Sequence, residues 1–141
     1  MNDATNPDPI VASAARWFWW IAGLSLVNTV MFYSGSDASF VIGLGMTAVA
    51  GVMFSGSVAV SLAIIGLILG FYFLMGLFAQ RGAAWAFYLG IGLYVVDALI
   101  YVKLESWMSV AFHAYAIFCI ARGLMRLREI NAIPVAANDS V

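Results

Sequence analysis

Residues 83–103 read AAWAFYLGIGLYVVDALIYVK and residues 107–128 read WMSVAFHAYAIFCIARGLMRLR, with only LES between them. An α-helix rises about 1.5 Å per residue, so about 20 apolar residues cross the roughly 30 Å hydrocarbon core of a bilayer. Both runs have that length, and neither contains proline. The pair therefore predicts a helical hairpin within a membrane.

Two upstream runs have the same character, at about residues 16–33 and 57–80. The segment 39–54, SFVIGLGMTAVAGVMF, differs because it holds three glycines and would be only about 24 Å long as a helix. We expect it to be a re-entrant or interfacial helix. The predicted fold is an all-α membrane protein, an antiparallel bundle of four transmembrane helices plus this short helix. The bundle is expected to form one domain over residues 15–131, between polar tails at 1–14 and 132–141.

The composition supports a membrane protein and excludes several other classes. Of the 141 residues, 65% are hydrophobic and 9% are charged, and the mean hydropathy is +1.00. A net charge of -1 provides no basic surface for nucleic acid. One cysteine and one histidine exclude a Cys-pair zinc site and an HExxH motif within the chain. We expect no catalytic residues, no metal, no cofactor and no enzymatic activity.

The basic residues predict an orientation, because Lys and Arg near span ends favour the cytoplasm. With four crossings and both termini cytoplasmic, only Lys103 lies outside, and five residues lie inside: Arg16, Arg81, Arg122, Arg126 and Arg128. With five crossings and the N-terminus outside, the count falls to four against two. The count favours four crossings with cytoplasmic termini.

Small residues at helical spacing mark the faces through which membrane helices approach closely. One such stripe lies in the run 57–80 and another in the run 83–103; they comprise Ala59, Ala63, Gly66 and Gly70, and Ala86 and Gly90. We expect both stripes to face neighbouring helices within the bundle. A seam between two copies of the chain is the alternative.

Asp97 and His113 are expected to meet inside the membrane. They stand eight residues before and eight residues after Glu105, so each lies about 12 Å below the same end of its helix. An ionisable group in hydrocarbon needs a partner, and we expect direct contact or one bridging water. Asn28 reaches a similar depth, and the predicted cluster is completed by tyrosines: Tyr33, Tyr94 and Tyr101.

Two interpretations of this cluster stay open. In the first, Asp97 and His113 form a structural clasp in a non-enzymatic bundle that acts as an accessory or assembly subunit. In the second, they handle a proton or a small ligand, because histidine titrates near neutral pH. A dry, packed pair favours the first interpretation, and a solvated pocket that reaches Asp97 favours the second.

The stretches SFVIGLGMT at 39–47, WAFYLGIGLYVVDALIY at 85–101 and WMSVAFHAYAIFCIARGL at 107–124 together resemble small bacterial integral membrane proteins with no assigned activity. The resemblance implies a bacterial plasma (inner) membrane and brings no catalytic motif. The expected partners are the lipid bilayer and a protein partner or a second copy of the chain.

Overall fold

The computed structural model describes residues 7–35 and 43–133. Within them the chain forms five helices and no strand: α1 (Pro9–Tyr33), α2 (Gly45–Met53), α3 (Val58–Gln80), α4 (Ala84–Lys103) and α5 (Trp107–Ala132). The predicted tails lie outside the described residues at 1–6 and 134–141, as does the beginning of the segment 39–54.

Four of the helices, α1, α3, α4 and α5, are long and apolar enough to cross a membrane. The fifth, α2, has nine residues and is only about 14 Å long, less than half of the hydrocarbon thickness. The predicted fold class, four spanning helices and one short helix in an all-α bundle, is confirmed.

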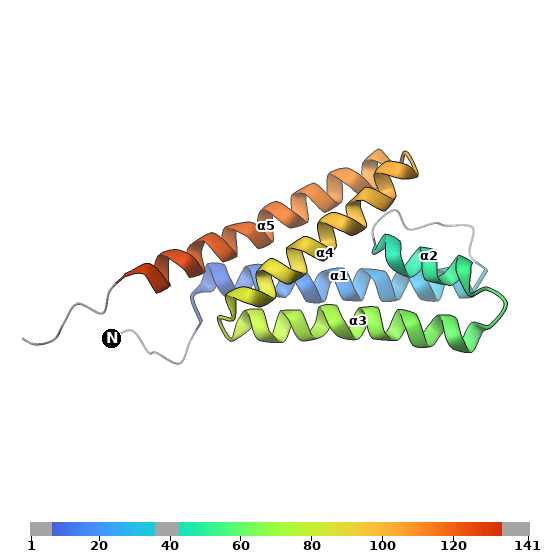
Figure 1. Cartoon of the computed structure of the whole chain (residues 1–141), viewed down its shortest axis with the longest axis horizontal. Coiled ribbons are helices and arrows are strands. Elements are labelled where there is room, and N and C mark those ends of the chain that lie inside the picture. The colour runs from blue at the N-terminus through green and yellow to red at the C-terminus, as the bar shows by residue number, and fades with distance from the viewer. Residues whose placement is uncertain (1–6, 36–42, 134–141) are drawn as a thin grey trace, which may run out of the picture.

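Helix α1 begins at Pro9, ahead of the boundary expected at residue 15. Asp8 caps it, because its Oδ1 accepts a hydrogen bond from the Ile10 amide at 2.9 Å, and a proline in the first turn has no amide that needs a partner. Asp8 also accepts a hydrogen bond from Arg126 on α5 at 3.1 Å. The start of α1 therefore lies beside the last turns of α5 (Figure 1).

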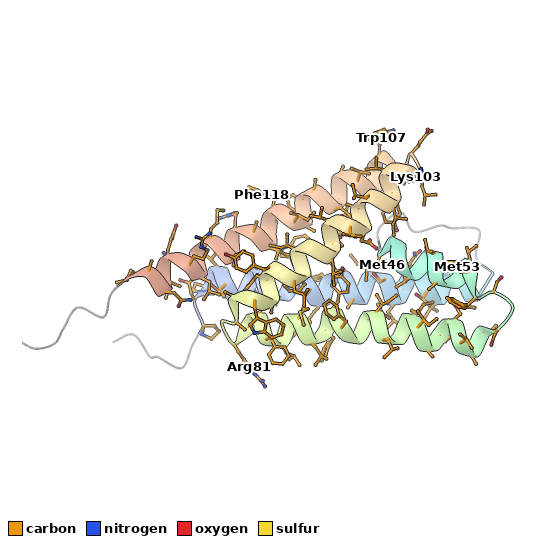
Figure 2. All side chains as sticks on the ribbon, viewed as in Figure 1. Met46, Met53, Arg81, Lys103, Trp107 and Phe118 are labelled. Atoms are coloured by element: carbon orange, nitrogen blue, oxygen red, sulfur yellow. The ribbon has the colours of Figure 1, made fainter. Side chains whose placement is uncertain are left out.

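The four long helices run alternately up and down the bundle (Figure 1). Helix α1 packs on α3 and α5, and α4 packs on α5 and α3. Arg81, in the turn between α3 and α4, lies at the end of the bundle opposite Lys103 and Trp107 (Figure 2). The basic residues are thus distributed between the two ends as the charge count assumes.

Helix α2 enters and leaves the bundle at one end. It lies alongside the last turns of α1 and α4 and the first turns of α3 (Figure 1). Both α1 and α3 have an end next to it, so the chain returns to the same side of the bundle after α2. Both alternatives for the segment 39–54, a re-entrant and an interfacial helix, place α2 at one end of the bundle in this way.

The prediction that the small-residue stripe of α3 packs against neighbouring helices was wrong. The four residues of the stripe are all exposed on the bundle surface: Ala59, Ala63, Gly66 and Gly70. A Cβ built on Gly66 or Gly70 would meet nothing within 4 Å. Helix α3 packs instead through another face: Ser61, Ile65, Tyr72, Met75, Gly76 and Ala79. Residue size alone could not phase this helix, because apolar residues surround its whole circumference.

On α4 the small residues do lie in the interior. Ala86 and Gly90 are buried, and a Cβ on Gly90 would overlap the ring of Phe18 on α1. Gly76 on α3 has the same relation to Trp19, and Gly123 on α5 to Ala14. Helix α1 is therefore the central helix of the bundle. Each of the other three spanning helices has a glycine at the point where a side chain of α1 packs against it.

Candidate functional site

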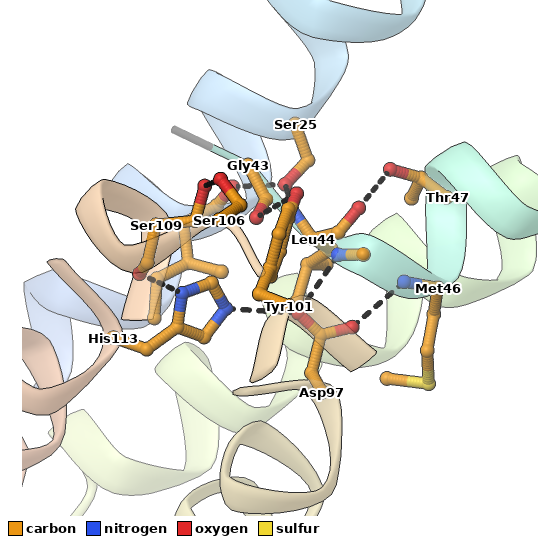
Figure 3. Close-up of polar contacts among 12 residues, drawn as sticks. Ser25, Gly43, Leu44, Met46, Thr47, Asp97, Tyr101, Ser106, Ser109 and His113 are labelled. Atoms are coloured by element: carbon orange, nitrogen blue, oxygen red, sulfur yellow. Dashed lines mark hydrogen bonds and ion pairs between the residues drawn. The ribbon is translucent and has the colours of Figure 1, made fainter. Parts of the chain in front are cut away.

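The structure brings Asp97 of α4 and His113 of α5 into direct contact. His113 Nε2 lies 2.9 Å from Asp97 Oδ2, and both side chains are completely buried. The contact follows from the hairpin, because the turn around Glu105 sets the two residues at matching depth. Both project into the space between α4, α5 and α2 (Figure 3).

The Asp97 carboxylate also caps helix α2. Its Oδ2 accepts a hydrogen bond from the Gly45 amide at 2.8 Å, and its Oδ1 accepts one from the Met46 amide at 2.7 Å. The first amides of a helix have no partner within the helix, and the N-terminus carries a partial positive charge. The N-cap residue, Leu44, has no side-chain acceptor. A carboxylate from α4 therefore does what an Asp or Ser at the N-cap position usually does.

Side chains of α1 and α4 satisfy the backbone that leads into α2. Ser25 Oγ accepts a hydrogen bond from the Leu44 amide at 2.8 Å and donates to the Ile21 carbonyl at 2.7 Å. Tyr101 donates to the Gly43 carbonyl at 3.1 Å (Figure 3). Irregular backbone is tolerated at membrane depth only where the protein supplies such partners. Ser25, Asp97 and Tyr101 together make it possible for the chain to turn inside the bundle.

The other end of α2 is held by a second polar contact. Ser61 on α3 donates a hydrogen bond to the Ala50 carbonyl at 3.3 Å, and Tyr33 at the end of α1 donates to Ser61. Tyr33 thus belongs to this contact and not to the Asp97 cluster. Both ends of the short helix are fixed by polar side chains from the spanning helices.

Aromatic rings enclose His113. The Tyr94 ring stacks on the imidazole with centroids 4.3 Å apart and planes inclined by 19°, and the Tyr101 centroid is 5.1 Å away. Tyr72 lies edge-on to Tyr94 at 6.3 Å. Its hydroxyl is buried and has no hydrogen-bond partner within the part of the chain that the structure describes. The rings close the site off from the surface of the bundle.

The partner atoms of the two His113 ring nitrogens indicate which of them carries a hydrogen. His113 Nδ1 lies 2.8 Å from the Ser109 carbonyl oxygen, which can only accept, so Nδ1 carries a hydrogen. A neutral imidazole would then turn the lone pair of Nε2 towards Asp97, so the 2.9 Å contact needs a second proton between the two side chains. Asp97 and His113 together are neutral, either as an ion pair or as carboxylic acid and imidazole. The two α2 amides on the carboxylate favour the ion pair.

Asn28, a predicted cluster member, lies beside the backbone that leads into α2. It sits beside Gly43, where its Nδ2 would be 3.4 Å from a Cβ built on that glycine. The α1 side chain that takes part in the network is Ser25. The sequence reasoning also missed Ser109, Tyr72 and the two α2 amides. A segment too short to cross needs acceptors for its first amides, and this signal could have pointed from residues 45–46 to a buried carboxylate.

Comparisons with protein-family models, curated proteins and solved structures found no match.

Within residues 7–35 and 43–133, no three His, Cys, Asp or Glu side chains come together as metal ligands. The chemistry that the described residues of the site show is hydrogen bonding, centred on the contact between Asp97 and His113. The chain is an integral membrane helical protein whose interior polar network surrounds the beginning of the short helix α2.

Proposed function

We propose that this chain is a non-enzymatic membrane protein, an accessory or assembly subunit, in which four spanning helices hold a re-entrant helix in a fixed position. One observation carries the proposal: the Asp97 carboxylate joins α4, α5 and the first two amides of α2 through three hydrogen bonds. All three hydrogen bonds join the carboxylate to groups of the protein itself, as expected of a structural clasp.

Burial supports the same proposal. Asp97, His113 and Ser25 have no exposed surface, whereas catalytic and ligand sites in proteins are usually concave and open to a cavity. The outward side of α2 and its C-cap residue carry apolar side chains that are exposed: Val49, Val52 and Met53 on the helix, and Phe54 at the cap. The clasp would present this surface in one orientation to a partner protein or a second copy of the chain.

We place the chain in a bacterial plasma (inner) membrane with both termini cytoplasmic. The support is the resemblance described above, together with the arginines near the end of the bundle at which the described chain begins and ends. The α2 end of the bundle would then face the periplasm.

Site-specific photo-crosslinking tests the proposed role. A photo-crosslinking amino acid at position 53, where Met53 is 71% exposed, is compared with one at position 67, where Leu67 is 75% exposed on α3. We expect one discrete protein adduct of fixed stoichiometry at position 53, identified by mass spectrometry, and only lipid adducts at position 67. The adduct should disappear in Asp97→Ala chains that still insert. Lipid adducts alone at both positions would overturn the proposal.

Proton handling is the second candidate function, and two observations favour it. His113 Nε2 and Asp97 Oδ2 lie within hydrogen-bond distance of each other, and the buried Tyr72 hydroxyl next to Tyr94 has no partner within the described residues. Proteoliposomes with an internal pH dye separate the two functions. A proton flux that Asp97→Asn abolishes while the variant still folds would favour proton handling, and the absence of flux is expected for the clasp.

A further inference from the structure

A groove of about 620 Å³ lies between α1 and α5, away from the Asp97 network. It is lined by Ser13, Arg16, Trp17, Trp20, Leu24 and Phe112. A second hollow of about 240 Å³ also contacts Ser13 and Trp17, and it extends the groove to Cys119 and Arg122. The two hollows thus form one surface, which we call the α1/α5 groove.

Two arginines, Arg16 and Arg122, border this groove. No acidic side chain among residues 7–35 and 43–133 pairs with Arg16 or Arg122, and Arg122 lies 6.0 Å from the ring of Phe118. By contrast, Arg126 nearby is bound to Asp8 and Glu129. Unpaired guanidinium groups at the end of a membrane bundle attract anions, and their planar donors suit a phosphate.

The groove changes from charged to apolar along its length. From Arg16 to Leu24 it follows α1 for about 12 Å into the bundle, and its deeper part is formed by Trp20, Leu24 and Phe112. Tryptophan is typical of the boundary between headgroups and acyl chains. An ion as small as free phosphate would contact the arginines alone. A groove that is charged at one end and apolar along the rest fits a molecule with an anionic head and a long apolar chain.

We propose that the α1/α5 groove binds one anionic phospholipid, with the phosphate between Arg16 and Arg122 and an acyl chain along Trp20, Leu24 and Phe112. Ser13 lines both hollows and provides a hydroxyl for the glycerol or headgroup oxygens. The site is specific for a headgroup with net negative charge, because a zwitterionic lipid brings its own cation to the arginines. It does not depend on the role of Asp97.

Native mass spectrometry of the full chain with phosphatidylglycerol and phosphatidylcholine tests the proposal. We expect one phosphatidylglycerol per chain, preferred over phosphatidylcholine by about tenfold or more. Arg16→Gln with Arg122→Gln should abolish the preference. Arg81→Gln, which removes an arginine from the same end of the bundle but outside the groove, should leave it unchanged. Equal binding of both lipids by the parent, or equal losses in all variants, would overturn the proposal.

Two further experiments test whether the apolar half of the groove binds an acyl chain and whether the bound anion is a lipid headgroup or free phosphate. Leu24→Trp fills the deeper part without changing charge, and it should weaken phosphatidylglycerol binding while the melting temperature is kept. Cys119 lines the second hollow, so bound phosphatidylglycerol should slow its reaction with a maleimide, and millimolar inorganic phosphate should not. Protection by phosphate alone, or normal lipid binding in Leu24→Trp, would contradict a lipid site.

Discussion

At the scale of single residues, Asp97 takes part in two tertiary contacts, one with His113 and one with the first amides of α2. Substitution of His113 and substitution of Asp97 should therefore destabilise the bundle by different amounts. Its Oδ2 accepts hydrogen bonds from His113 and from the Gly45 amide, and its Oδ1 accepts one from Met46. Loss of His113 removes the positive partner and leaves a buried charge, whereas loss of the negative charge leaves a neutral acceptor with too few lone pairs. The first loss is the more costly, because desolvated charge is harder to accommodate than a lost hydrogen bond.

We therefore expect His113→Leu to destabilise the bundle by about 3–5 kcal/mol and Asp97→Asn by about 1–3 kcal/mol. In Asp97→Asn, whichever way the new side chain is turned, its NH2 group faces a backbone N–H of α2, and two donors then oppose each other. Thermal unfolding in detergent measures both variants, with Tyr88→Phe, on an exposed tyrosine, as the control. Equal melting temperatures for His113→Leu and the parent would show that the pair contributes nothing to stability.

Asp8 predicts a pH dependence at the start of α1. Desolvation raises its pKa, but the hydrogen bonds from the Ile10 amide and Arg126 outweigh this effect and hold the pKa below its ordinary value. A carboxyl with a depressed pKa stabilises the folded state above its unfolded pKa and loses this contribution as the pH falls through the folded value. The first turn of α1 should therefore fray in acid, below about pH 4.

Hydrogen exchange of the first amides of α1 as a function of pH measures this effect. Asp8→Asn keeps an N-cap acceptor, so it should retain protection at neutral pH and lose the acid dependence. Arg126→Gln should move the acid transition to higher pH. A parent whose protection does not change with pH would contradict the assignment.

At the scale of the elements, the sequence determines helix length better than helix rotation. Four spans follow from the length of apolar runs, and the depth of Asp97 and His113 follows from counting residues to a turn. The rotation of α3 does not follow, because a helix without charged residues presents no polar face. Its inward face is set by partners that only the folded bundle brings close: Trp19 against Gly76, and Tyr33 against Ser61.

A pair of glycines tests this corrected rotation. Gly90→Ala should destabilise the bundle by about 1–3 kcal/mol, because the added methyl overlaps Phe18 in a closely packed interior. Gly66→Ala should be neutral or slightly stabilising, because its site is open and alanine favours a helix. Melting temperatures in detergent distinguish the two. A large loss in Gly66→Ala would mean that the exposed stripe on α3 is covered, and chemical crosslinking between chains would then identify a second copy.

The hydrogen bond between Ser25 and the Leu44 amide, which fixes the start of α2, gives a further prediction. Ser25→Ala removes the acceptor of the buried Leu44 amide, which should cost about 1–3 kcal/mol and increase hydrogen exchange in Gly45–Met53 more than in α3. Ser34→Ala is the matched control, because that serine donates to a carbonyl in its own helix at an exposed position. Unchanged exchange in α2 would show that Ser25 is dispensable for holding it.

At the scale of the whole molecule, the predicted and the unforeseen features have different physical origins. Span number and the separation of charge between the ends depend on the bilayer, whose thickness and surface are the same for every chain. The path of α2 depends on hydrogen-bond partners from three different helices: Asp97 accepts from its first amides, Ser25 accepts from the Leu44 amide, and Ser61 donates to the Ala50 carbonyl. No local pattern encodes that coincidence. The sequence could therefore predict that segment 39–54 does not cross, but not where it would be bound.

Topology provides the last prediction. Because α2 returns to the end at which α1 finishes, positions 34, 55 and 105 should all lie on one side of the membrane, and position 128 on the other. In a Cys119→Ser background, Ser34→Cys, Ser55→Cys and Glu105→Cys should react with an impermeant maleimide added outside intact cells. Arg128→Cys should react only after permeabilisation, since its end of the bundle carries the arginines and is expected to be cytoplasmic. A crossing by α2 would instead put position 34 on the side opposite position 55, whereas reaction of Arg128→Cys alone from outside would keep the fold and invert its orientation.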